Sequence, residues 1–302
     1  MALRITVSRH SAFYSPLIAT IAAGFLERQG LAAEYGILKK GQRSSDLIRS
    51  GAVDIMQSAV SSSWRPLDAD EPDLPVHFAQ INQRDGFYLV GRAPDAAFTW
   101  KKLEGKSLLA DHGLQPLVML KYAVRVNGAE WQAIRSVDAG TPEKMQRSFR
   151  QGDADFVHLQ APFSHQLEAE GAGYVVASVG ASMPTVAFSS LCCSRSFFET
   201  EDCRNFTAAF RQAREWAQSA APEEVAEKEA GFFPGLPVEV LASSIRSYQA
   251  VGCWSGGIEI TPPLYEQALN VFEAAGELRR RHPWEKVCAV PPDEARLSSP
   301  GL

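Results

Sequence analysis

The chain has 302 residues, of which 45% are hydrophobic, so it can bury one large core or two of ordinary size. Its formal net charge is −5, and Arg279 to Arg281 is a basic run of the kind found on solvated helix ends, which argues against a nucleic-acid-binding protein. The apolar run from Leu17 to Leu26 contains Thr20 and is too short to span a bilayer. The sequence therefore predicts a soluble globular protein that does not span a membrane.

The cysteines bear on the cellular compartment. There are five, Cys192, Cys193, Cys203, Cys253 and Cys288, and an odd number with an adjacent pair is not typical of a disulfide framework. A reducing compartment fits this usage, and no secretory leader is visible, so the chain as written is expected in the cytoplasm. A leader trimmed before the opening Met-Ala would instead place it in the periplasm.

Strands and helices alternate through the first third of the chain. Apolar and polar residues alternate over 3–8, which predicts a strand, and apolar residues recur at helical spacing over 14–29. Further strands are expected over 33–38, 53–59 and 76–81. A last strand resumes at 87–90 with no helix before it, which is typical of a strand that crosses between lobes.

A second alternating series follows a linker at 92–98. Its expected strands are 107–110, 156–159, 174–177 and 186–191, and its expected helices are 117–126, 141–149 and 163–169. Four more helices are expected over 203–218, 222–230, 237–248 and 263–275, and the Pro-rich end over 290–302 predicts a flexible tail. Two such series imply an α/β protein with two lobes, residues 1–84 with 190–302 and residues 85–189.

Polar residues gather after the expected strands of the first lobe. Ser61 follows strand 53–59, and hydroxyls beyond the carboxyl end of a strand in an open parallel sheet are typical of a ligand site. Ser44 and Ser45 are predicted to cap a helix beside Arg43, which suits an anionic group. These serines can equally serve only as caps, and Arg43 can be an ordinary solvated residue.

Other candidates lie at strand ends or near the expected crossover. His10 can hydrogen-bond a ligand or lie on the surface, and Tyr14 can stack on a ligand or pack at the core edge. Gln80 and Asn82 carry amides that donate and accept, toward a ligand or within the crossover itself. The expected ligand-binding residues are His10, Tyr14, Ser15, Gly41, Gln42, Arg43, Ser44, Ser58, Ala59, Val60, Ser61, Gln80, Asn82, Gly113, Leu114, Gln115, Gln160 and Phe188.

Three stretches carry a family resemblance through their order and spacing. They are Leu-Glu-Gly-Lys at Leu103 to Lys106, Leu-Gln-Pro with Leu-Lys-Tyr-Ala within Leu114 to Ala123, and the segment from Phe149 to Pro162. The chain resembles the SsuA/THI5-like, NMT1-like group, which contains solute-binding proteins of ABC importers for sulfonates, nitrate, taurine and thiamine pyrimidines. The resemblance implies a two-lobed periplasmic-binding-protein-like fold of type II, with each lobe a mixed sheet flanked by helices and a ligand cleft between the lobes. It also implies two crossover strands between the lobes, expected here over 85–90 and 186–191.

The resemblance also implies a function. The expected protein is a monomeric binder without cofactor or metal that captures a sulfonate, a nitrate-like anion or a pyrimidine for an ABC permease. Gln160 stands where the family often has Glu, so a charge for a cationic or amide ligand is absent. The alternative is a cytosolic enzyme that resembles thiamine pyrimidine precursor synthase and uses iron and pyridoxal phosphate, for which Cys192-Cys193 is only a partial match. No catalytic or metal-binding spacing supports it.

Overall fold

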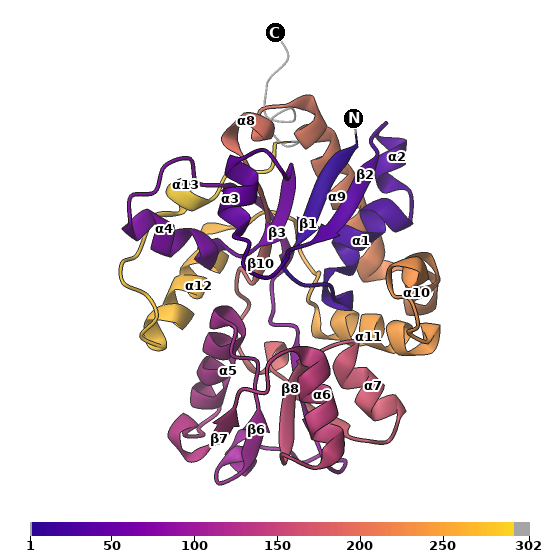
Figure 1. Ribbon diagram of the computed structural model, residues 1–302, viewed down its shortest axis with the longest axis vertical. Helices are drawn as coiled ribbons and strands as arrows, with labels where there is room; N and C mark the ends of the chain where they lie inside the picture. Colours follow the sequence, from indigo (N-terminus) through magenta and orange to yellow (C-terminus); the bar gives the residue numbers. More distant parts are fainter. Residues whose placement is uncertain (1, 293–302) are drawn as a thin grey trace.

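The structure is a computed structural model that describes residues 2–292, and its named strands form two five-stranded sheets (Figure 1). One sheet lies in each half of the molecule, with helices around both. We call the half built on the sheet that contains the first strand lobe 1, and the other half lobe 2. The tail predicted over 290–302 lies outside the described residues from 293 onward.

The sheet of lobe 1 has the strand order β2-β1-β3-β10-β4. Its strands are β1 (Leu3–Val7), β2 (Ala33–Ile37), β3 (Ile55–Ser58), β4 (Val76–Asn82) and β10 (Ser189–Cys193). β1 runs parallel to β2 and β3, whereas β10 runs antiparallel to β3 and β4. The loops that follow β1 and β3 therefore leave the sheet side by side at one edge.

The sheet of lobe 2 has the order β7-β6-β8-β5-β9 and repeats this mixed pattern. Its strands are β5 (Phe87–Gly91), β6 (Ser107–Leu109), β7 (Arg135–Val137), β8 (Phe156–Gln160) and β9 (Tyr174–Ser178). β6 is parallel to β7 and β8, and β5 is antiparallel to β8 and β9. The sequence did not predict β7, because this strand has only three residues, mostly exposed, and shows no alternation.

Helices flank both sheets, and the longer ones from α5 onward stand where the sequence predicts them, whereas the helix expected over 14–29 is divided into α1 and α2, and α8 and α13 were not predicted. They are α1 (Ser15–Ala22), α2 (Phe25–Arg28), α3 (Ser44–Arg49), α4 (Trp64–Asp68), α5 (Leu114–Val126), α6 (Pro142–Gln151), α7 (Phe163–Ala169), α8 (Arg195–Phe198), α9 (Glu201–Ser219), α10 (Pro222–Glu229), α11 (Val238–Val251), α12 (Pro262–Ala274) and α13 (Trp284–Val287). Short 3₁₀ turns include η1 (Ala12–Tyr14), η2 (Val60–Ser63) and η4 (Trp131–Ala133). No helix within residues 2–292 is long and apolar enough to cross a membrane.

Two helix starts show where cap prediction works and where it fails. Thr141 caps α6, because its side chain accepts a hydrogen bond from the backbone N–H of Lys144. The cap predicted for α3 was wrong. Arg43 is the N-cap residue there, no side chain caps the helix, and Ser44 is already its first residue.

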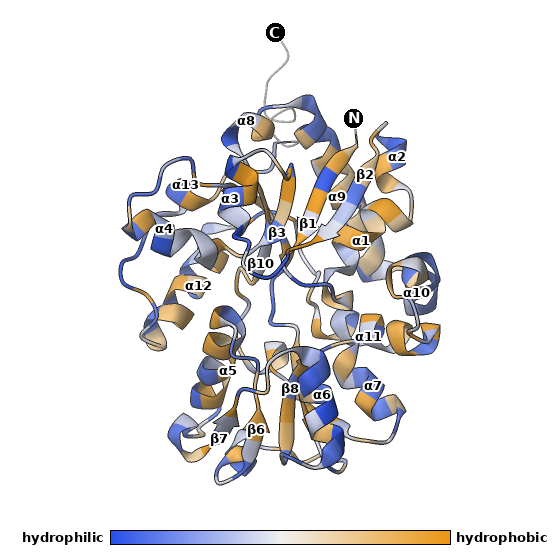
Figure 2. Cartoon of the chain, in the orientation of Figure 1, coloured by the Kyte–Doolittle hydropathy of each residue, from blue (hydrophilic) through white to orange (hydrophobic). Residues whose placement is uncertain are grey.

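Apolar side chains on the inner strands and on one face of each long helix form the core (Figure 2).

A buried arginine links the C-terminal helices to lobe 1. The guanidinium of Arg214, in α9, donates to the carbonyl oxygens of Ile81 at 3.0 Å, Ser255 at 3.0 Å and Gly256 at 2.6 Å. Burial lowers the pKa of Arg214 to about 10, so the side chain stays charged at neutral pH. It thus fixes α9 against the end of β4.

The chain passes between the sheets over 83–86 and again over 179–188. The crossovers were expected later, over 85–90 and 186–191, yet β5 pairs with lobe 2 from Phe87 onward. A tight turn explains the early change of lobe, because Oδ1 of Asp85 accepts from the Phe87 N–H at 2.6 Å. Gly86 packs on Phe13, where an added Cβ would lie 2.4 Å from the ring. Only glycine fits this approach.

Candidate ligand-binding cleft

A cavity of about 250 Å³ lies between the lobes. Its lining comes from the carboxyl ends of β1, β3 and β8, the start of α5 and the second crossover. The lining residues are Ser8, Arg9, Tyr14, Gln57, Ser58, Ala59, Ser62, Phe87, Gln115, Pro116, Gln160, Phe188 and Ser189. Carboxyl ends of neighbouring parallel strands are where open α/β sheets bind ligands, so we take this cavity as the candidate site.

The lobe 1 wall is rich in hydroxyls held by a buried amide. Oε1 of Gln57 accepts from the Ser8 N–H at 3.0 Å and from the Ser8 hydroxyl at 2.7 Å. The amide nitrogen of Gln57 donates to the Ser58 carbonyl at 3.2 Å, and the Ser58 hydroxyl donates to that of Ser62 at 3.0 Å. These bonds fix the loops after β1 and β3 and present donors and acceptors to the cavity.

Hydrogen bonds bridge the lobes beside the cavity. The Ser61 hydroxyl donates to Oε1 of Gln115 at 2.7 Å, and Nε2 of Gln115 donates to the Phe188 carbonyl at 2.5 Å. Nearby, the Ser11 hydroxyl donates to the Ala161 carbonyl at 2.8 Å. Because Ser61 and Ser11 belong to lobe 1 while Gln115 and Ala161 belong to lobe 2, these contacts hold the lobes together over the cavity.

An ion pair adds to this bridge. Nη1 of Arg9, after β1, lies 2.5 Å from Oδ2 of Asp111, after β6, and the guanidinium lies 5.6 Å from the centroid of Phe87. Burial alone would raise the pKa of Asp111, but the charge and hydrogen bond of Arg9 and the Gly113 N–H hold that pKa below its usual value. Arg9 lines the cavity, whereas its counter-charge does not. Arg9 therefore presents its guanidinium to the cavity, and Asp111, which does not line the cavity, balances most of its charge.

The rest of the lining carries an unused acceptor from lobe 2 and aromatic surfaces from both lobes. Gln160 is 4% exposed, and its Oε1 has no hydrogen-bond partner, so it can accept a hydrogen bond from a ligand. Burial raises the pKa of Tyr14 to about 12, which keeps its phenol neutral. Phe87 stacks on His158 with centroids 4.3 Å apart, and Phe188 meets Phe13 edge-on at 5.4 Å.

Behind Phe87 lies an unusual buried histidine. His158 is fully buried, and neither of its ring nitrogens has a partner. Burial lowers its pKa to about 3, so the imidazole is neutral and acts as an aromatic support for the cavity wall.

The structure brings six of the eighteen expected residues into the cavity lining: Tyr14, Ser58, Ala59, Gln115, Gln160 and Phe188. Three more, Val60, Ser61 and Leu114, are chain neighbours of lining residues, and Gly113 lies two residues before Gln115. Sequence reasoning missed Ser8, Arg9, Gln57, Ser62, Phe87, Pro116 and Ser189. The signal for Arg9 was present, because it directly follows the carboxyl end of the first strand.

Four expected residues make structural hydrogen bonds away from the lining. The ring nitrogens of His10 contact the Tyr35 hydroxyl and the Phe232 carbonyl, and the Ser15 hydroxyl donates to Glu229 at 2.7 Å. Gln80 donates to the Gly257 carbonyl at 2.9 Å, and Asn82 donates to the Ser189 hydroxyl at 3.0 Å. Of these hydrogen bonds, only that of Asn82 reaches a lining residue.

The segment Gly41, Gln42, Arg43 and Ser44 does not line the cavity. Nη2 of Arg43 lies 3.1 Å from Oε1 of Glu71, and the Arg43 side chain is 54% exposed. The segment follows β2, the edge strand of its sheet, so it leaves the sheet one strand farther out than the loops after β1 and β3 that line the cavity. The cation at the cavity is Arg9.

Metal and thiol chemistry finds little support among residues 2–292. No three His, Cys, Asp or Glu side chains in this part of the chain come together to hold a metal ion. Cys192 and Cys193 are buried free thiols, and burial raises the pKa of each well above its usual range. Protonated buried thiols are poor nucleophiles and poor metal ligands.

Known proteins share this architecture. The chain is 23% identical over 292 residues to the Bacillus subtilis (strain 168) protein named "Putative binding protein YtlA", covering 94% of this chain and 86% of that protein. The periplasmic aliphatic sulphonate binding protein SsuA from Escherichia coli superimposes with a TM-score of 0.72 at 15% identity, covering 94% of this chain and 96% of SsuA. The periplasmic nitrate-binding protein NrtA from Synechocystis PCC 6803 gives 0.69 at 14% identity, covering 99% and 89%.

These likenesses confirm the predicted fold, two mixed sheets flanked by helices in the arrangement of periplasmic binding proteins. The model of the family described as "NMT1/THI5 like" matches residues 12–225, which is well over half of the chain. The chain belongs to the NMT1/THI5-like family.

Proposed function

We propose that this protein is the solute-binding component of an ABC importer and captures a small organic molecule in the interlobe cavity. The observation that carries the proposal is the cavity itself, a polar space of about 250 Å³ whose walls come from both lobes. Its volume is slightly below the range of typical ligand pockets, roughly 300 to 1,000 Å³, which suits a small solute. The named functions of SsuA and NrtA support the same class.

The lining indicates how a ligand would be held. Arg9 and the hydroxyls of Ser62 and Ser189, which accept from Ser58 and Asn82 and so keep their own protons, offer donors to an acceptor-rich group, such as a sulfonate, a nitrate-like anion or a pyrimidine nitrogen. Phe87 and Phe188 offer apolar faces to the rest of the molecule. Asp111 already balances the charge of Arg9. The affinity of the site for an anion should therefore exceed its affinity for a neutral acceptor by less than it would at an unpaired arginine.

Binding and release follow from the two-lobed arrangement. We infer that residues 1–84 with 190–302 move as one body and 85–189 as the other, about the two crossovers. The ligand enters when the lobes separate and is enclosed when the bridges at Gln115 and Arg9 form. A permease would then receive the ligand from a monomeric binder.

The test is a calorimetric and thermal-shift screen of alkanesulfonates, nitrate and pyrimidines. A true ligand at a hundred times its Kd should add about 2.7 kcal/mol to the free energy of unfolding and should be recovered unchanged. Arg9→Gln should weaken an anionic ligand by about one order of magnitude, since a charge-assisted hydrogen bond contributes about 1.5–3 kcal/mol.

Arg43→Gln is the matched control, because it removes an exposed arginine outside the lining. Equal losses from both arginine variants, or consumption of the ligand, would overturn the proposal.

A further inference from the structure

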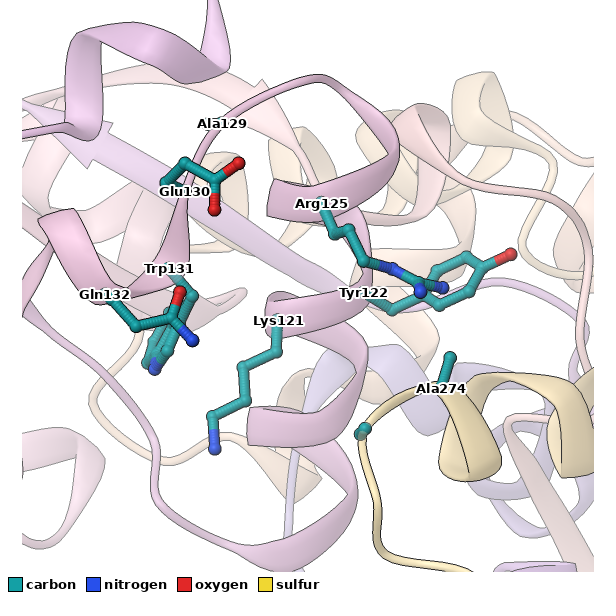
Figure 3. A pocket seen from close by; sticks show the side chains of 9 residues that line it. Lys121, Tyr122, Arg125, Ala129, Glu130, Trp131, Gln132 and Ala274 are labelled. Atoms are coloured by element: carbon teal, nitrogen blue, oxygen red, sulfur yellow. The ribbon is translucent and has the colours of Figure 1, made fainter.

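A second pocket, of about 320 Å³, lies on the flank of α5, apart from the interlobe cavity. Its walls come from the C-terminal half of α5, from the segment that follows it through η4, and from the end of α12 (Figure 3). It shares no lining residue with the cavity, so the proposed solute function does not account for it.

Two cations from α5 dominate this pocket. Lys121 and Arg125 lie four residues apart, so they share one face of the helix. Neither makes an ion pair with a carboxylate among residues 2–292, unlike Arg9 or Arg43. Both positive charges therefore stay without a direct carboxylate contact in the pocket.

Aromatic rings take the place of carboxylate partners. Nζ of Lys121 lies 5.6 Å from the centroid of Trp131, and Cζ of Arg125 lies 5.3 Å from the centroid of Tyr122. Such contacts hold a cation in place without cancelling its charge. Figure 3 shows the two cationic side chains and the two rings around the pocket.

The pocket spans the boundary between the lobes. Tyr122, in α5 of lobe 2, accepts a hydrogen bond from Nε2 of Gln267 in α12 at 3.4 Å. α12 belongs with lobe 1, because Phe272 packs edge-on against Trp64 with centroids 4.9 Å apart. A molecule in this pocket would contact both lobes.

We propose that this pocket binds a small aromatic anion. Its negative group pairs with Lys121 and Arg125, and its ring packs on Trp131 and Tyr122. Glu130 also lines the pocket and is the one carboxylate among its described lining residues, so it opposes the anion and keeps the affinity modest. The proposal therefore predicts two opposite effects on affinity. Removing either cation weakens binding, and removing the charge of Glu130 strengthens it.

The experiment uses phenyl phosphate as the probe and the ¹⁵N-labelled full chain. The readout is the indole N–H resonance of Trp131, assigned by its disappearance in Trp131→Phe. Phenyl phosphate should shift this resonance in a saturable way, while benzyl alcohol, which lacks charge, should shift it far less. Lys121→Gln and Arg125→Gln should each weaken binding about tenfold, because each removes one charge-assisted contact. Glu130→Gln should strengthen binding a few-fold.

Two control variants test whether binding is specific to this pocket. Arg135→Gln and Arg43→Gln each remove an exposed arginine outside the pocket, so both should leave the Trp131 titration unchanged. Thermal melts should show that every variant folds. The proposal is overturned if phenyl phosphate leaves the Trp131 resonance in place, or if Arg135→Gln weakens binding as much as Arg125→Gln.

Discussion

Arg9 and Asp111 join the two lobes through an ion pair of 2.5 Å, in which the arginine faces the cavity and the aspartate lies behind it. Asp111 is 4% exposed, so its charge depends on this partner. A buried carboxylate that loses its cation keeps its desolvation cost without the compensating attraction. The pair is therefore expected to stabilise the folded protein as well as to contribute to ligand affinity.

Arg9→Gln is expected to lower the free energy of unfolding by about 1–3 kcal/mol, because it leaves Asp111 buried without a cation. Urea denaturation at pH 7 measures the change. The double variant with Asp111→Asn should recover part of the loss, since neither charge then remains. If the two single changes add without any recovery, the ion pair does not couple these residues.

The buried carboxyl of Asp85 should make the free energy of unfolding fall as the pH rises, which is the opposite of the effect of an ion-paired carboxylate. Burial, with a smaller effect from Asp111, raises the pKa of Asp85 to about 7 from its ordinary value of 3.8. The folded state therefore favours the neutral carboxyl. Its contribution to stability is fully present below pH 3.8 and is lost as the pH rises to about 7.

Asp85→Asn tests this, because the amide oxygen can still accept from the Phe87 N–H while carrying no charge. The variant should gain stability over the wild type by about 1.4 kcal/mol for each pH unit between pH 4 and 7. Urea denaturation at pH 5 and pH 8 measures the gap. A gap that is the same at both pH values would show that Asp85 titrates normally.

Gly86→Ala is expected to destabilise the first crossover. Its added Cβ would lie 2.4 Å from the ring of Phe13, which is fully buried and cannot move aside. Overpacking of this kind costs about 1–3 kcal/mol in the free energy of unfolding. Gly231→Ala is the matched control, since a Cβ there meets nothing within 4 Å, and it should change stability by less than about 0.5 kcal/mol.

The fold was predictable because strand and helix periodicity is a local property of the chain. The buried strand β3 and the long helix α9 were both expected within two residues of their observed ends. β7 was missed because its register is set by pairing with β6, a partner distant in sequence. Periodicity carries no information about such pairing.

The cleft was only partly predictable, because strand order decides which loops meet. Ser58 and Gln160 were found as the ends of β3 and β8. Arg43 was chosen for its charge and its helix start, but its segment follows the edge strand β2 and pairs with Glu71. Nothing in the sequence states that β1 and β3 are neighbours, which is what makes Arg9 the cation of the site.

Gln115 provides the last prediction, because it bridges the lobes through both ends of its amide. It accepts from Ser61 at 2.7 Å and donates to the Phe188 carbonyl at 2.5 Å. Gln115→Met keeps the length of the side chain but removes both bonds. Closing the lobes then becomes less favourable, so a cleft ligand should bind about tenfold more weakly, as expected for two neutral hydrogen bonds.

Small-angle X-ray scattering should show a larger radius of gyration for unliganded Gln115→Met than for the wild type, because its lobes separate more often. Gln151→Met, at an exposed position outside both pockets, serves as the control and should leave both the radius and the affinity unchanged. Weaker binding without any change in radius would mean that Gln115 acts only by touching the ligand. An unchanged affinity would mean that the Gln115 bridge does not hold the closed state, which then depends on Arg9 with Asp111 and on Ser11 with Ala161.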